Sequence, residues 1–265
     1  SEFVKIIFVF FAAAMLARVR NFADVVKVSI PAAIHVLILI AEKDLGGALI
    51  FYITYIVILY AATRKEGYIL LGAGALAAGA AAAYKLFYHV RVRVAAWKDP
   101  WSDVANKGYQ VTQSLFAIGT GGWFGMGLCE GTPQKIPVSK TDFIFSAICE
   151  EMGVFFGLCI ILVEISCFVM FINISLKINS RFYKLTALGL SVEYMFQTFL
   201  TIGGVTKFIP STGVTLPLVS YGGSSVTSTM ILFAIIQGLY VKNSGRGEIG
   251  ETDGKRQRRS RRNEE

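Results

Sequence analysis

One acid, Asp142, stands where a basic, proline-containing segment meets a long apolar run, in KIPVSKTDFIFSAICEEMG from Lys135 to Gly153. A carboxylate at such a junction can take a proton as a general base or hold a divalent cation. A simpler interpretation is also open, because Ser139 and Asp142 have the spacing of a capping box, in which the acid closes the first turn of a helix. The local pattern alone does not decide whether Asp142 is a helix cap or a catalytic residue.

A second acid, Glu150, follows Asp142 by eight residues in the same segment. In a helix this spacing separates the two by about 12 Å, at roughly 1.5 Å per residue. The paired carboxylates of glycoside hydrolases lie about 5 to 9.5 Å apart. If Asp142 is catalytic, we therefore predict that it acts without a partner acid.

The segment before Asp142 carries a glycine run at residues 119–127, together with cations and tryptophans. No strand or βαβ unit surrounds the glycines, which argues against a dinucleotide-binding loop. Two interpretations stay open: a basic loop with interfacial aromatic residues, and a cradle for a phosphate-bearing lipid, since cations and free backbone N–H groups complement a diphosphate. The residues concerned are Arg91, Arg93, Lys98, Lys107, Lys135, Lys140, Trp97, Trp101 and Trp123.

Membrane helices are the elements that must position these residues. The chain has 54% hydrophobic and 17% charged residues, which is too apolar for an ordinary soluble domain of 265 residues. A span needs about 20 residues, so the short second run is either re-entrant or extended through its polar flanks. We predict an all-α polytopic membrane protein with about seven transmembrane helices, from apolar runs at residues 3–17, 28–41, 45–62, 68–88, 143–173, 182–202 and 214–241.

Lys and Arg are concentrated in alternate short connections and in the C-terminal tail. By the positive-inside rule these segments face the cytoplasm, which places the C-terminus inside and the loop of residues 89–141 outside. The chain then divides into a membrane domain, residues 1–242, and a basic tail, residues 243–265, that we expect to be disordered. An outside N-terminus predicts that an odd number of spans precedes this sequence.

Several remaining features favour structural roles. The basic tail fits anionic membrane lipids better than nucleic acid, because no folded aromatic or basic platform accompanies it. The four cysteines lack the spacing of a metal site or a disulfide framework. Glu164 and Glu193 lie within apolar runs and indicate a polar interior, because an ionised carboxylate in a membrane needs a polar partner or cavity.

Five strings carry a resemblance to a known family: SEFVK at Ser1, DLGGAL at Asp44, GYQVTQSLFAIGTGGWFGMGL at Gly108, KTDFIFSAICEEMG at Lys140 and PSTGVTLPLVSYGGSS at Pro210. In this order they resemble the signature segments of the SEDS family, the shape, elongation, division and sporulation proteins. Members have ten membrane helices. This chain resembles the portion from the fourth helix onward, that is, the last seven.

The resemblance implies a peptidoglycan glycosyltransferase in a bacterial cell membrane. Such an enzyme polymerises lipid II into β-1,4-glycan at the outer face, with undecaprenyl diphosphate as the leaving group. Asp142 matches the family's essential acid, as a base or as a ligand for a divalent cation such as Mg²⁺ or Mn²⁺; no organic cofactor is implied. The implied partners are lipid II and a class B penicillin-binding protein that acts as transpeptidase.

Other positions match the family more loosely, as substrate-binding or site-shaping residues. Departures at Cys129, Val138 and Lys140 leave open whether the chain serves elongation, division or sporulation. The matched positions, together with Lys140, are Glu2, Lys5, Gln110, Gln113, Lys135, Glu150, Glu151, Ser220, Gly222, Gly223 and Ser224.

Two other functions stay open. Polytopic helices with intramembrane acids and a basic outer cavity also suit a transporter of lipid-linked precursors. A non-catalytic scaffold for other wall enzymes is the third hypothesis, and it would apply if the portion given by this sequence is inactive by itself. A transporter needs a sealed bilayer to show its activity, whereas a polymerase does not.

Overall fold

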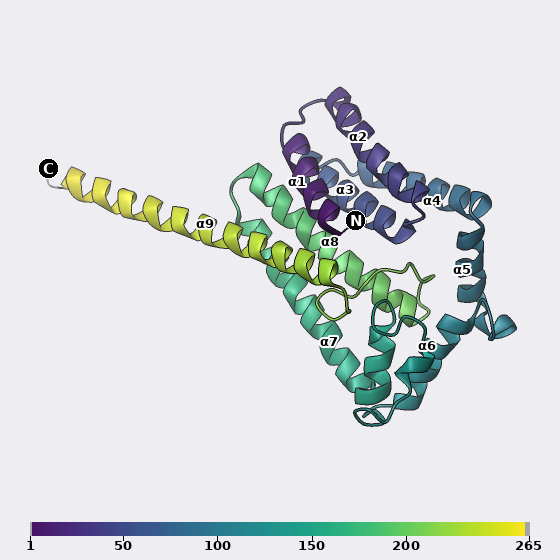
Figure 1. Cartoon of the computed structure of the whole chain (residues 1–265). Helices are drawn as coiled ribbons and strands as arrows, with labels where there is room; N and C mark the ends of the chain where they lie inside the picture. The colour runs from purple at the N-terminus through teal and green to yellow at the C-terminus, as the bar shows by residue number, and fades with distance from the viewer. Residues whose placement is uncertain (1, 263–265) are drawn as a thin grey trace.

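The computed structural model describes residues 2–262, with side chains as far as Asn243. Within this part of the chain the secondary structure is helical (Figure 1). The elements are α1 (Glu2–Leu16), α2 (Phe22–Ala41), α3 (Leu45–Thr63), α4 (Gly67–Leu86), α5 (Tyr88–Lys98), a 3₁₀ turn η1 (Pro100–Asp103), α6 (Tyr109–Gly121), a second 3₁₀ turn η2 (Pro133–Lys135), α7 (Ile144–Lys177), α8 (Arg181–Val205) and α9 (Gly223–Arg262).

Six of these helices are long and apolar enough to cross a membrane: α2, α3, α4, α7, α8 and the part of α9 from Gly223 to Asn243. The predicted class, a polytopic helical membrane protein, is confirmed. The predicted count of about seven exceeds this by one because α1 has only 15 residues, about 22 Å of helix. The short second run reaches 20 residues because its polar flank joins the helix, with Asn21 and Asp24 forming a capping box.

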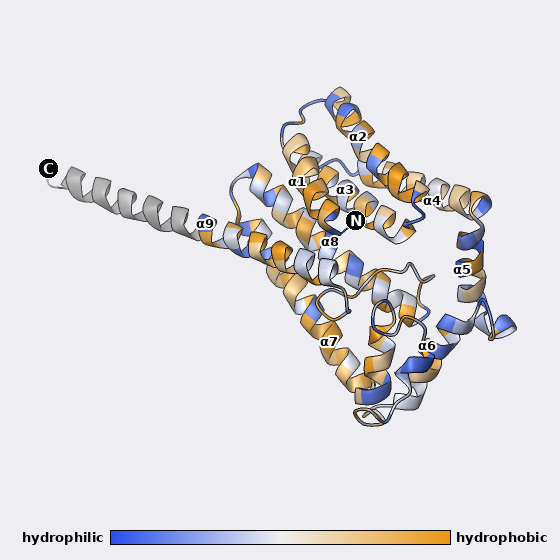
Figure 2. Ribbon diagram, viewed as in Figure 1, coloured by the Kyte–Doolittle hydropathy of each residue, from blue (hydrophilic) through white to orange (hydrophobic). Residues whose placement is uncertain are grey.

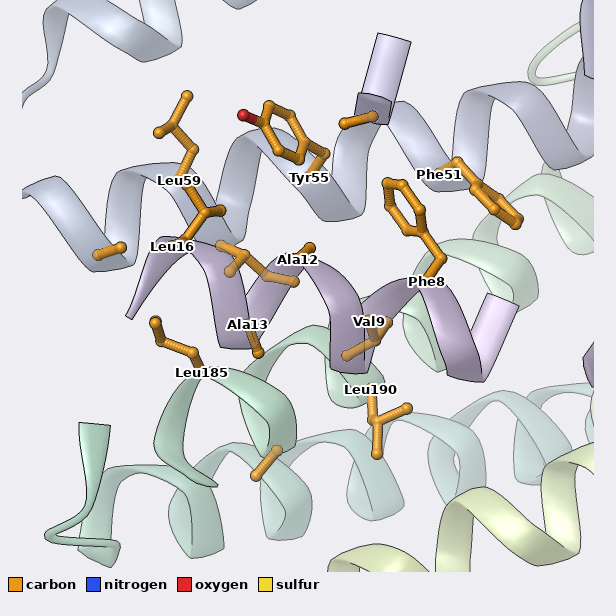
Figure 3. Packing of buried hydrophobic residues seen from close by; sticks show 14 of the residues in the cluster. Phe8, Val9, Ala12, Ala13, Leu16, Phe51, Tyr55, Leu59, Leu185 and Leu190 are labelled. Carbon is orange, nitrogen blue, oxygen red and sulfur yellow. The ribbon is translucent and has the colours of Figure 1, made fainter. Parts of the chain in front are cut away.

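Helix α1 lies at the centre of the bundle, between α3 and α8 (Figure 3). Ala12 and Ala13 are fully buried, and small residues of this kind let membrane helices approach closely. The larger side chains around them fill the core. Figure 3 shows these as Phe8, Val9 and Leu16 of α1, Phe51, Tyr55 and Leu59 of α3, and Leu185 and Leu190 of α8.

Hydrophobic residues run along most of the helices (Figure 2), and many of the large ones are exposed. On α7 the exposed large hydrophobic residues begin at Phe155 and continue to Leu176. A soluble protein rarely exposes so long an apolar face, whereas a lipid-facing helix requires one. The predicted basic tail, residues 243–265, falls almost wholly outside the residues whose side chains the structure describes, and its disorder stays a prediction.

The loop predicted at residues 89–141 contains helices of its own. Helix α5 has 11 residues and α6 has 13, so neither is long enough to span the membrane. In Figure 1 they lie together at one end of the bundle, and α6 packs against α7. This end of the molecule holds Asp142.

Candidate active site

Asp142 lies one residue before Phe143, the N-cap residue of α7, and this cap has no side-chain hydrogen bond. The capping interpretation is therefore wrong, and the carboxylate is left for another role. It is partly buried, and this burial raises the pKa of Asp142 above its usual range. The Thr141 hydroxyl and the Arg93 charge oppose the rise, in that order of size.

Arg93 reaches the same place from helix α5. Its Nη1 donates a hydrogen bond of 2.9 Å to the carbonyl oxygen of Thr212. A Cβ added to Gly213 would lie 3.5 Å from Arg93 Nη2 and 3.5 Å from Asp142 Oδ2, so both charged groups face one point of the backbone. Three segments therefore meet here: the one before α9, helix α5 with the Arg93 guanidinium, and the turn before α7 with the Asp142 carboxylate.

The segment between α8 and α9 also holds the backbone of the Asp142 turn. The Ser220 hydroxyl is buried, donates to the Thr141 carbonyl at 2.7 Å and accepts from the Leu216 N–H at 2.8 Å. One residue later, the Tyr221 N–H donates to the Lys140 carbonyl at 2.8 Å. These bonds fix the position of the turn that carries Asp142.

We predict that Ser220→Ala lowers the free energy of unfolding by roughly 1 to 3 kcal/mol, because the buried Leu216 N–H and the partly buried Thr141 carbonyl both lose a partner. Ser224→Ala is the matched control, since Ser224 lies in the same motif with an exposed side chain. Its effect should stay within about 0.5 kcal/mol. Thermal unfolding of the two variants in detergent measures the difference, and equal melting temperatures would contradict the role given to Ser220.

An apolar cavity of about 570 Å³ opens beside Arg93 and Thr212. Helices α2, α3, α4, α5 and α8 line it, together with the segment after α8. Asp142 lines a separate small pocket of about 10 Å³, room for about one water molecule, which shares Ser211 and Thr212 with this cavity. The side chains that line the larger cavity include Ile40, Leu49, Leu76, Ala80, Phe196 and Ile209.

A comparison with known protein families shows which family this chain matches. The FtsW, RodA and SpoVE family, described as "Cell cycle protein", matches residues 1–245. The chain belongs to this family. The sequence-based assignment to the SEDS family is thus confirmed.

Curated relatives in this family include peptidoglycan glycosyltransferase RodA of Mycobacterium tuberculosis (strain H37Rv), 38% identical over 252 residues, which cover 89% of this chain and 54% of the relative. The probable peptidoglycan glycosyltransferase FtsW of Geobacter sp. (strain M18) is 34% identical over 219 residues, covering 80% and 58%. The chain spans about half the length of the curated relatives it matches.

A solved structure gives the same relationship in three dimensions. It is described as "Structural coordination of polymerization and crosslinking by a peptidoglycan synthase complex". One of its chains superposes with a TM-score of 0.71 at 26% identity, covering 91% of this chain and 69% of that one. The helical arrangement described above is therefore also found in a chain of that complex.

Glu150 and Glu151 of this SEDS protein contact the segment between α6 and η2. Glu150 is buried, and its Oε1 accepts hydrogen bonds from the Thr132 N–H (3.2 Å) and hydroxyl (3.4 Å). The Glu151 carbonyl accepts from the Gly127 N–H at 3.0 Å. Both glutamates therefore contact the loop that precedes Asp142 in sequence.

The other loop residues singled out from the sequence lie closer to solvent. Gln110, Lys135 and Lys140 are exposed and Gln113 is partly buried. In the described part of the chain, no hydrogen bond or ion pair joins their side chains to Asp142. Any role of these four in binding substrate stays a prediction.

Glu2 and Lys5 belong to a separate polar network inside the helix bundle. Lys5 Nζ is buried, 2.9 Å from Glu2 Oε2, and donates to Gln197 Oε1 at 2.8 Å. Gln197 Nε2 donates to the Thr215 carbonyl at 3.0 Å, and the Thr215 and Ser225 hydroxyls are 2.9 Å apart. The network thus joins α1 and α8 to the motif that holds the Asp142 turn.

The polar interior predicted from the acids within the apolar runs is present. Glu164 and Glu193 are both buried, and Glu164 Oε2 accepts from the Thr198 hydroxyl at 3.2 Å. Glu193 Oε2 has no hydrogen-bond partner. Gln197 and Thr215 were not singled out from the sequence, because polar amides and hydroxyls in apolar runs have no distinctive spacing.

The donor set around Asp142 does not fit a resident metal ion. The described residues contain no group of three or more His, Cys, Asp and Glu side chains able to hold one, and the charged neighbour of Asp142 is Arg93. The divalent cation stays an untested expectation, and no step below depends on it.

Proposed function

We propose that the protein is a peptidoglycan glycosyltransferase that polymerises lipid II. The observation that carries the proposal is a partly buried carboxylate, Asp142, that faces the same backbone position as Arg93, which lines an apolar cavity. Curated relatives in the same family bear the name peptidoglycan glycosyltransferase. Glycosyl transfer from a lipid diphosphate needs a base for the acceptor hydroxyl, a cation for the leaving diphosphate and an apolar cavity for its lipid chain.

Asp142 activates the acceptor. Its carboxylate takes the proton from the 4-hydroxyl of one sugar as that oxygen attacks the anomeric carbon of the other. A general base works best when its pKa lies near the working pH. Burial moves the pKa of Asp142 in that direction, because the charged form loses hydration.

Arg93 and the cavity act on the donor. As the bond from the anomeric carbon to the diphosphate breaks, negative charge grows on the leaving oxygen, and a fixed guanidinium stabilises it. The isoprenoid chain of the leaving group enters the cavity of about 570 Å³, whose lining is apolar apart from a few groups near Arg93. The diphosphate then lies at Arg93, which lines this cavity.

The orientation follows from the basic connections. The α5–α6 end faces outward and the C-terminus is cytoplasmic, as the positive-inside rule requires. We predict that single cysteines at residues 108–140 react with impermeant reagents on intact cells and that cysteines at residues 256–262 do not. Labelling of the tail from outside would reverse the orientation and remove the site from the outer face.

The partner we propose is a class B penicillin-binding protein that crosslinks the new strands. The structural relative comes from a complex that couples polymerization to crosslinking. We expect the whole protein to co-purify with a single-pass transpeptidase from the same cell. Recovery without that partner, under conditions in which a known pair of this type stays together, would argue against the complex.

A transporter of lipid-linked precursors is the second candidate function. The buried groups Lys5, Glu164 and Glu193 inside the bundle favour it, because charged groups at membrane depth often mark transport pathways. Purified whole protein mixed with lipid II in detergent separates the two functions. Glycan chains support the polymerase, whereas translocation in sealed vesicles without glycan in detergent supports the transporter.

A further inference from the structure

The glycine-rich loop before η2 exposes a cluster of large apolar side chains. The exposed fractions are 67% for Trp123, 87% for Phe124, 50% for Met126 and 71% for Leu128. The sequence has no charged residue from Gly108 to Cys129. A patch of this kind needs a covering surface, because exposure to water is unfavourable for each of these side chains.

The backbone of this loop is joined to a break in α7. Gly153 has φ 88° and ψ 164°, which interrupts the helix. The N–H groups of Val154 and Phe155 donate instead to the carbonyls of Gly122 (2.9 Å) and Trp123 (3.2 Å). Returning bonds run from the loop to α7, from Met126 N–H to the Glu150 carbonyl at 2.9 Å and from Gly127 N–H to the Glu151 carbonyl at 3.0 Å.

Glycines make this close approach between the two backbones geometrically feasible. A Cβ at Gly125 would lie 2.2 Å from the Glu151 carbonyl oxygen, and a Cβ at Gly153 would lie 2.4 Å from the Trp123 carbonyl oxygen. The exchange of hydrogen bonds also satisfies backbone groups that a broken helix would otherwise leave open.

The position of the break along α7 gives its depth in the membrane. Gly153 and Lys177 are 24 residues apart, about 36 Å at roughly 1.5 Å per residue. A hydrocarbon core is about 30 Å thick. With Lys177 among the headgroups of one leaflet, Gly153 lies at the boundary of the other. The exposed apolar face of α7 begins at the same level, with Phe155.

We infer that residues 122–128 form an interfacial anchor, whose side chains Trp123, Phe124 and Leu128 enter the lipid of the outer leaflet. The lipid is identified as the occupant because the patch continues the lipid-facing surface of α7 at the depth where aromatic side chains concentrate. The anchor holds the adjoining segment, with Glu150 and η2, at a fixed height above the hydrocarbon. It does not depend on the proposed reaction.

Site-directed fluorescence in lipid nanodiscs tests the anchor in the whole protein. Within the given sequence, a background with Cys129→Ser, Cys159→Ala and Cys167→Ala retains only the buried Cys149, and any cysteine elsewhere in the whole protein is replaced by Ala. Into it we would place Phe124→Cys in the loop, Phe155→Cys on the lipid face of α7, or Lys107→Cys as an exposed charged position outside the patch. Each cysteine carries an environment-sensitive nitrobenzoxadiazole probe.

We expect the probe at residue 124 to behave like that at residue 155: emission at shorter wavelength, quenching by lipids with a shallow nitroxide, and protection from iodide. The probe at residue 107 should show the reverse. Quenching at residue 124 by iodide as strong as at residue 107 would overturn the anchor. Protection from both quenchers would also overturn it, because a protein surface would then cover the loop.

The native Trp123 provides a measurement that leaves the loop unchanged. The given sequence has three tryptophans, so Trp97→Phe with Trp101→Phe leaves Trp123 as its one indole emitter, and any tryptophan elsewhere in the whole protein is replaced by Phe as well. Lipids brominated near the headgroup should quench its fluorescence. Emission that stays constant as the brominated fraction rises would contradict insertion of Trp123.

Discussion

Asp142→Asn should reduce the rate of lipid II polymerisation by about 10²- to 10⁴-fold, the range typical for loss of a general base. The same change should leave the melting temperature unchanged or raise it. Because burial raises the pKa of Asp142 in the folded state, the folded protein holds this proton more tightly than the unfolded chain does. The ionised carboxylate therefore lowers stability above that pKa, and a neutral amide of the same shape removes the cost.

Rate and melting temperature together separate the roles once considered for this acid. A helix cap would lose about 1 kcal/mol of stability when replaced and keep most of its rate. Glu151→Gln is a matched control, since it also neutralises an acid of this segment with a partly buried side chain. A variant Asp142→Asn that polymerises at nearly the normal rate but melts earlier would exclude the catalytic role.

Arg93→Gln should reduce the polymerisation rate by roughly 10²- to 10³-fold, by analogy with removal of one group that stabilises charge in a transition state. Arg93→Lys keeps the charge but loses the planar guanidinium, and we expect it to retain more activity. Arg91→Gln is the control, because Arg91 lies on the same helix and is exposed. Glycan yield from purified lipid II measures all three, and equal losses at residues 91 and 93 would contradict the role of Arg93.

The hydropathy of each sequence segment, taken by itself, predicted the membrane helices well. Apolar runs marked α3, α7 and α8 within a few residues, because lipid imposes length and hydropathy on each helix separately. The run at residues 3–17 also marked α1 (Glu2–Leu16) within one residue at each end, although its 15 residues fall short of a full span. The outer segment was also underestimated, since α5 and α6 are too short and too polar to give a strong signal.

The sequence identified only part of the site. Asp142 was found through its motif, but the spacing with Ser139 also fitted a helix cap, and only the start of α7 excluded that interpretation. Arg93 was one cation among many, because the fold and not the spacing brings it to Asp142 across 49 positions of sequence. The same holds for Gln197, which meets Lys5 from another helix.

The pH dependence of polymerisation tests most directly whether Asp142 is the base. A base must be deprotonated, so the rate should fall as the pH drops through the raised pKa of Asp142. The Arg93 charge holds that pKa down, so Arg93→Gln should move this acid limb to higher pH, while Arg93→Lys leaves it near its normal position. An acid limb at the same pH in all three proteins would contradict the account.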